Sequence, residues 1–166
     1  MTDAAQLRPT LGRRLGQSLL AGGSIVVILL ALDLLLHTAI ASSLGATAFI
    51  VLAMPHTPAA RPRSVLGGYL CGLAAGLLCW LLVLGVSTLW PAVPLRPVQI
   101  ALGGAAVALA TLLMASAQTP HPPAAGFALG LVLEFWDLYT LLLVAAAVLL
   151  LSGLRLALRR WLIDLA

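Results

Sequence analysis

The stretch "MPHTPAARPR", Met54 to Arg63, interrupts a chain that is otherwise almost continuously apolar, and its first half returns as "TPHPPAAG", Thr119 to Gly126. Proline donates no backbone hydrogen bond and does not continue a helix, so both stretches predict helix ends. A bilayer tolerates irregular backbone only where protein or a water-filled cavity supplies hydrogen-bond partners. These two breaks therefore decide how the helices are divided and where polar groups enter the fold.

The composition around the breaks is that of a membrane protein. Of the 166 residues, 62% are hydrophobic and 8% are charged, which is too little polar surface to cover a water-soluble domain. Nine arginines against five acidic residues give a net charge of +4. The arginines lie between or beyond the apolar runs rather than on one polar face. We therefore expect a lipid bilayer as the environment and no nucleic acid as a partner.

The breakers divide the chain into six apolar pieces, which we interpret as helices: Gln17 to Leu36, Leu44 to Met54, Val65 to Leu89, Val98 to Ala117, Ala124 to Leu133, and Leu138 to Leu154. At about 1.5 Å per residue, four of them are long enough to cross a hydrocarbon core of about 30 Å. The second and fifth pieces reach only about half way. The sequence thus predicts an all-α, polytopic membrane helical bundle in one transmembrane domain over residues 1–166, with residues 1–16 as a basic cytoplasmic tail.

The arginines predict the topology. If all six pieces change sides, eight arginines lie on the side of the N-terminus and only Arg96 lies on the other, where Glu134 and Asp137 form a solvated loop. If both short pieces turned back, Arg61 and Arg63 would move out. The positive-inside rule favours six crossings. We expect an integral protein of the cytoplasmic (inner) membrane with both termini in the cytoplasm.

The order long, short, long occurs twice, in residues 17–90 and 97–160. One shift aligns two sets of glycines: Gly22, Gly23 and Gly45 with Gly103, Gly104 and Gly126. Halves of three helices would be inverted relative to each other, as in many secondary transporters that build a site from broken helices. Helix N-termini after Ser43 and after Pro123 would then present free N–H groups to an anion. Ordinary helix capping by serine and proline is the alternative.

The run "GATAFIVLAMPHTPAARPRSVLGG", together with "HPPAAG", resembles the HPP family of integral membrane proteins, which is named for its His-Pro-Pro motif. The resemblance covers most of the chain from about Leu44. It implies a small multi-spanning protein and, because relatives are linked to nitrite transport, a carrier of a small inorganic anion. The chain departs from the family pattern at Ser64, at Ala125 and Gly126, and at Tyr69, where histidine is common. The matching motif residues are Gly45, Ala46, Thr47, Pro55, His56, Pro58, Pro62, Arg63, Gly67, Gly68, His121, Pro122, Pro123 and Ala124.

The breaks and the resemblance together give nine candidates for substrate binding or the pathway: Ser43, Gly45, Thr47, His56, Arg63, His121, Pro122, Pro123 and Gly126. Histidine titrates near neutral pH, which suits a gate or an anion donor. An interfacial, hydrogen-bonding histidine and an arginine that only sets topology are the alternatives. Asp33 and His37, four residues apart, are either a proton-coupled pair or interfacial residues that reach water.

Gly68, Gly72 and Gly76 leave one face of the third piece bare, so we expect another helix to pack there, from the same chain or from a second copy in a homodimer. The sequence contains no nucleophile elbow, HExxH, CxxC or phosphate-binding loop, and we expect no enzyme, metal or cofactor. Two functions remain. One is a passive or proton-coupled carrier of a small inorganic anion, and the other is a non-transporting membrane scaffold or assembly subunit.

Overall fold

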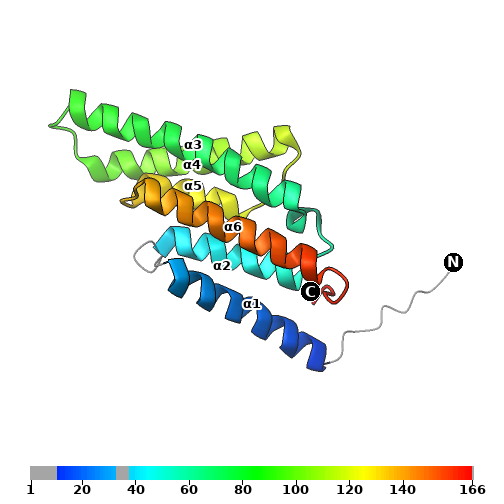
Figure 1. The fold of residues 1–166 in the computed structure, drawn as a ribbon. Helices are drawn as coiled ribbons and strands as arrows, with labels where there is room; N and C mark the ends of the chain where they lie inside the picture. The colour runs from blue at the N-terminus through cyan, green and yellow to red at the C-terminus, as the bar shows by residue number, and fades with distance from the viewer. Residues whose placement is uncertain (1–10, 33–37, 166) are drawn as a thin grey trace.

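The chain forms an all-helical bundle in a computed structural model that describes residues 11–32 and 38–165 (Figure 1). Its α-helices are α1 (Leu11–Leu32), α2 (Thr38–Ala53), α3 (Pro62–Leu89), α4 (Leu95–Ala117), α5 (Pro123–Leu133) and α6 (Leu138–Leu158), and a short 3-10 helix, η2 (Pro58–Ala60), precedes α3. By length and composition α3, α4 and α6 can cross a membrane, whereas α2 and α5 are shorter apolar helices. The predicted membrane helical bundle is confirmed. Asp33 and His37 lie outside the described residues.

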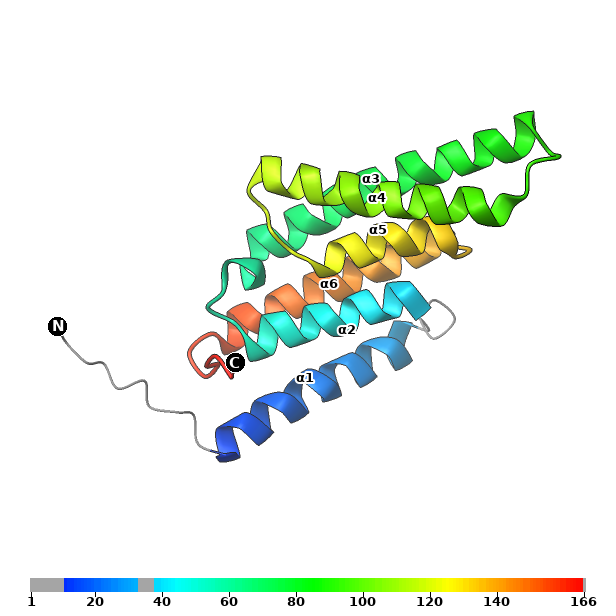
Figure 2. The same ribbon diagram turned by 180° about the vertical axis from the view of Figure 1, so that it is seen from behind.

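Each helix runs opposite to the helix before it (Figures 1 and 2). One end of the bundle therefore gathers the starts of α1, α3 and α5 and the ends of α2, α4 and α6. We call it the basic end, because it carries Arg61, Arg63, Arg155, Arg159 and Arg160. Arg96 lies at the start of α4, at the opposite end. Both short helices carry the chain from one end toward the other, in agreement with the six-crossing prediction.

The second helix is longer than predicted. It begins at Thr38 and has 16 residues, a length of about 24 Å. The serines of "ASSLG" lie inside it, because Ser43 Oγ donates to the carbonyl oxygen of Ile40 at 2.7 Å and Thr47 Oγ1 donates to that of Ser43 at 2.9 Å. These hydroxyls bond along the helix instead of ending it. The prediction of a helix N-terminus after Ser43 is therefore wrong.

A carboxylate of the protein itself occupies the true start of α2. Glu134 Oε1 accepts a hydrogen bond from the Ala39 N–H at 2.7 Å, where the helix dipole stabilises negative charge. In the same connection Asp137 caps α6, because its Oδ1 accepts from the N–H and the hydroxyl of Thr140, both at 2.8 Å. Asp137 is exposed, but the prediction of a solvated loop is wrong for Glu134, which is half-buried.

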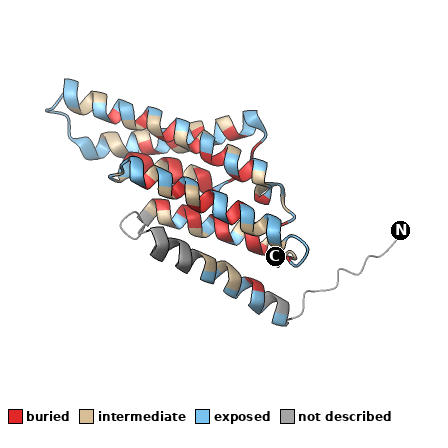
Figure 3. Ribbon diagram, viewed as in Figure 1, coloured by how far each residue is buried: buried red, intermediate tan, exposed pale blue. Residues whose placement is uncertain are grey.

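The central helix is α5, which packs against α2, α3 and α4 and is mostly buried (Figure 3). Helix α5 packs on the bare glycine face of α3. A side chain at Gly72 would collide with the carbonyl oxygen of Ala124, and one at Gly76 would lie 2.8 Å from Leu131 Cδ1. Small residues thus let the two backbones approach closely. The structure answers the question left by the sequence: the partner of this face is in the same chain, and its glycines are not available to a second copy.

The two halves of the chain repeat the predicted order of helices. The lengths are 22, 16 and 28 residues in the first half and 23, 11 and 21 in the second. The two short helices contact each other. An inverted duplication remains a prediction.

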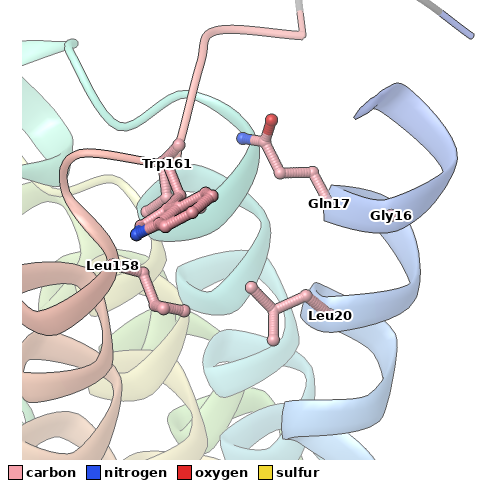
Figure 4. Close-up of a pocket in the computed structure, with 6 residues that line it drawn as sticks. Gly16, Gln17, Leu20, Leu158 and Trp161 are labelled. Carbon is pink, nitrogen blue, oxygen red and sulfur yellow. The ribbon is translucent and has the colours of Figure 1, made fainter. Parts of the chain in front are cut away.

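The segment after α6 folds across the basic end. Leu165 N–H donates to the carbonyl oxygen of Ala53 at 2.8 Å, and Gln17 Nε2 donates to those of Leu52 and Ile163, both at 2.6 Å. Figure 4 shows Gln17 extending from α1 toward this segment, beside a cavity of about 530 Å³. Because α1 begins at Leu11, part of the expected tail over residues 1–16 is helical.

Candidate functional site

Three of the nine predicted residues meet in one buried polar network. Ser43 and Thr47 of α2 and His121 of the α4–α5 loop converge on Tyr69 of α3. Thr47 Oγ1 lies 3.0 Å from His121 Nε2 and 2.9 Å from the Tyr69 hydroxyl, which lies 3.3 Å from Ser43 Oγ. His121 and Thr47 are both 0% exposed. We call these four side chains the buried network, since the core around them is apolar.

The proline-rich loop positions His121. Helix α4 ends at Gln118, which adopts the left-handed conformation with φ 55° and ψ 40°, and the Thr119 N–H bonds the carbonyl oxygen of Met114 at 3.0 Å. This left-handed cap turns the chain back into the bundle. A side chain at Gly68 would lie 2.6 Å from His121 Cβ. Glycine at that point of α3 is what lets the histidine reach the centre.

Side chains, rather than helix N-termini, supply the donors of this site. Pro123 has no N–H and stands at the first position of α5, where proline is favoured. The next two N–H groups, of Ala124 and Ala125, bond the carbonyl oxygens of His121 and Pro122, both at 3.0 Å. The start of α2 is held by Glu134 at the opposite end. The expected pair of helix N-termini facing one anion is therefore not formed.

The imidazole of His121 is held from two sides. Its Nδ1 lies 2.9 Å from the carbonyl oxygen of Ala59 in η2, and since a carbonyl only accepts, Nδ1 carries a hydrogen. Burial lowers the pKa of His121 below its ordinary value, and the bond to Ala59 partly offsets this shift. The ring is therefore neutral at pH 7, and Nε2 presents a lone pair to Thr47.

The buried network has six contacts but only four hydrogens, so it is two hydrogens short. Three of its contacts are donations to backbone carbonyl oxygens and three join side chains to one another. In the neutral state Ser43, Thr47, Tyr69 and His121 supply one hydrogen each. Tyr69 must therefore choose between Ser43 Oγ and Thr47 Oγ1, and Thr47 must choose between the Ser43 carbonyl and His121 Nε2. A proton on Nε2 would allow both bonds of Thr47 at once.

Four predicted residues do not join the network. Gly126 lies beside Ser43, because a Cβ at Gly126 would be 3.8 Å from that of Ser43. At the start of α5, Pro123 is buried and Pro122 is exposed. Gly45 lines a cavity of about 390 Å³ between α1 and α2. Glycine and proline offer no side-chain donor, so none of the four could bond an anion through its side chain.

His56 and Arg63 lie at the surface of the basic end. The His56 side chain is 63% exposed, and its Nδ1 lies 3.3 Å from Asp164 Oδ2. Arg63 is exposed in the first turn of α3. The structure therefore does not bring His56, Arg63 and His121 together in one site, as the sequence hypothesis of an inner path expected.

Sequence reasoning missed Tyr69. Its ring packs tilted against those of His121 and Phe127, with centroids 5.6 and 5.3 Å apart, and its hydroxyl links the two polar residues of α2. The available signal was its place directly after Gly68, where the family pattern has histidine. Within the described ranges, no group of three His, Cys, Asp or Glu side chains is placed to hold a metal ion.

Tyr69→Phe should lower the free energy of unfolding by about 1 kcal/mol, because it removes one buried hydroxyl while leaving the ring contacts in place. Thermal unfolding of the purified protein in detergent measures the loss. Tyr139→Phe is the matched control, since Tyr139 is exposed on α6 and its substitution should change nothing. Equal midpoints for the two variants would contradict the hydrogen bonds assigned to Tyr69.

Comparison with known proteins agrees with this architecture. Residues 7–162 match the family model described as "HPP, transmembrane region". No curated protein sequence and no solved structure matches the chain. The matched range includes the His-Pro-Pro motif whose histidine enters the buried network. The chain belongs to the HPP family of integral membrane proteins.

Proposed function

We propose that this protein is a membrane carrier for a small inorganic anion, with nitrite as the first substrate to test, and that it is not an enzyme. The observation that supports the proposal is the buried network, in which four polar side chains from three elements converge inside an apolar bundle. Polar groups at such positions are costly and commonly mark substrate pathways. The network holds two hydroxyl hydrogens that can turn toward a ligand, a histidine that can take up a proton, and no carboxylate among its four side chains, which suits it to negative charge.

The mechanism starts from a closed site, in which the donors satisfy one another. An anion entering beside Thr47 would accept the hydrogens that Thr47 and Tyr69 now share. A proton arriving with it at His121 Nε2 would add one of the two missing donors and offset the charge of the anion. Among the two modes expected from the sequence, this favours proton-coupled over passive transport.

The orientation in the membrane is part of the proposal. The basic end carries Arg61, Arg63, Arg155, Arg159 and Arg160, and the opposite end carries Arg96 together with Glu134 and Asp137. Positively charged connections are retained in the cytoplasm. We therefore place the basic end, and both termini, on the cytoplasmic side of the inner membrane.

The glycine face of α3, which favoured the scaffold alternative, does not support it. A bare glycine face on α3 would have invited a partner protein, but α5 covers that face. A homodimer through another surface stays compatible with the carrier.

Nitrite uptake into liposomes tests the carrier directly. Purified protein is reconstituted, the membrane potential is clamped with potassium and valinomycin, and trapped nitrite is measured colorimetrically. Protein-free liposomes are essential because nitrous acid crosses bilayers unaided. Nitrate, chloride and formate in parallel define the substrate class. Folded protein that moves none of these anions faster than protein-free liposomes contradicts the proposal.

A further inference from the structure

A second polar site lies at the basic end, outside the buried network. A cavity of about 520 Å³ is lined by Pro55, His56, Arg155, Leu156, Arg159 and Arg160. No acid is among the described residues that line it. The carboxylate of Asp164 pairs with His56 at 3.3 Å and so offsets part of the charge. Three arginines leave the cavity strongly positive.

Arg155 is built into this cavity. Its Nη2 donates to the carbonyl oxygen of Pro55 at 2.6 Å, while its Nε is buried and has no hydrogen-bond partner in the described part of the chain. A buried N–H without an acceptor is costly, and a phosphate oxygen is a strong acceptor for a guanidinium group. Arg61 is close enough for its charge to oppose that of Arg155. A bound anion would offset this repulsion and bring an acceptor to the guanidinium group of Arg155.

A separate apolar groove lies on the same face of α6 as this cavity. The groove is a cavity of about 320 Å³ between α3 and α6, lined in part by Leu66, Leu70, Val148 and Leu149. Leu149 is seven residues before Leu156 of the basic cavity, so the two share a helix face and lie about 10 Å apart along the axis. A molecule with a charged head and an apolar chain fits both.

We propose that an anionic phospholipid occupies this surface, with its phosphate at Arg155, Arg159 and Arg160 and one acyl chain in the groove between α3 and α6. Charge complementarity selects the head group, because a zwitterionic lipid would bring an amine toward the arginines. Tyr69 also lines the groove. If the proposed function holds, the acyl chain contacts the ring whose hydroxyl belongs to the transport site, so the lipid would tune uptake.

Native mass spectrometry of the full-length protein tests binding without measuring transport. Phosphatidylglycerol should be retained over phosphatidylcholine with the same acyl chains. Arg159→Gln with Arg160→Gln, both exposed, should weaken phosphatidylglycerol binding by roughly 30-fold, about fivefold for each arginine. Arg96→Gln, at the opposite end, is the matched control and should bind as wild type does. Ala145→Phe should also weaken binding, because it fills the groove at an exposed position.

Three results would overturn the assignment. They are equal retention of the two lipids, unchanged binding by the double arginine variant, and full displacement by inorganic phosphate while Ala145→Phe still binds. The last result would identify a free-anion cavity instead of a lipid site. Since no flux enters this measurement, a negative result leaves the proposed carrier untouched, and a failed uptake assay leaves the lipid site untouched.

Discussion

Gly72→Ala should lower the free energy of unfolding by about 3 kcal/mol, near the upper range for overpacking a core. A methyl group at Gly72 would collide with the backbone carbonyl oxygen of Ala124, and a backbone atom in the first turn of α5 cannot move aside as a flexible side chain would. Either α5 shifts or its packing against α3 is lost. In both cases His121, which precedes that turn, would leave the buried network.

Gly85→Ala provides the matched control on the same helix. A Cβ at Gly85 would meet nothing within 4 Å, so the substitution should stabilise α3 by up to about 1 kcal/mol through helix propensity. Thermal unfolding in detergent and the monodisperse yield of both variants measure the difference. Similar stabilities for the two variants would show that α5 does not dock on the glycine face of α3.

His121→Gln should reduce nitrite uptake by about tenfold, the factor expected for losing one hydrogen bond to a charged group. Glutamine retains a donor and an acceptor but cannot take up a proton at neutral pH. Uptake into liposomes at equal protein density measures the loss. An unchanged rate in folded His121→Gln protein would remove the histidine from the pathway.

The same variant should lose a dependence on pH that the wild type shows. Burial lowers the pKa of His121 in the closed state, and exposure to water returns it toward its ordinary value of 6.5. The open form therefore binds more protons, so a fall in pH below that value favours opening and raises uptake, by at most about tenfold per pH unit for one proton. By the same sign, the folded protein loses stability as the pH falls below 6.5.

Substitutions at two threonines distinguish a loss of uptake caused by the buried network from a loss caused by general destabilisation of the helices. Thr47→Val removes the hydroxyl that contacts His121 and should reduce uptake as well. Thr111→Val removes a similar intrahelical bond, to the carbonyl oxygen of Val107 at 2.8 Å, from an exposed face of α4. It should transport as wild type does. Equal losses of uptake in both variants would show that the effect of Thr47→Val is not specific to the buried network.

The sequence predicted the helices where proline or a long apolar run leaves little choice. The ends of α3, α4 and α5 near the two proline-rich breaks are close to the expected positions. The start of α2 was missed because serine is read as a helix cap, whereas buried serine and threonine hydroxyls can bond their own helix. The packing of α2 against its neighbours, which the sequence does not show, decides between these outcomes.

The candidate site was partly predictable for a related reason. His121 and Thr47 stood out through the family motif, and Ser43 through the expected start of the second apolar piece. Tyr69 and the carbonyl oxygen of Ala59 could not be inferred, because contacts between distant segments depend on how deeply the loop before α5 enters the bundle. Glu134 shows the same limit, since a carboxylate in a short connection gives no sign that it caps a helix 95 positions earlier in the chain.

The most direct test of the central claim is whether the buried network becomes accessible to water during transport. Ser43→Cys, in a protein whose Cys71 and Cys79 are replaced by alanine, is labelled in liposomes with a membrane-impermeant thiol reagent. We predict that the cysteine at position 43 is labelled slowly without anion, because Ser43 is buried, and faster when nitrite is supplied. Labelling that stays equally slow while nitrite is being taken up would show that the anion crosses elsewhere.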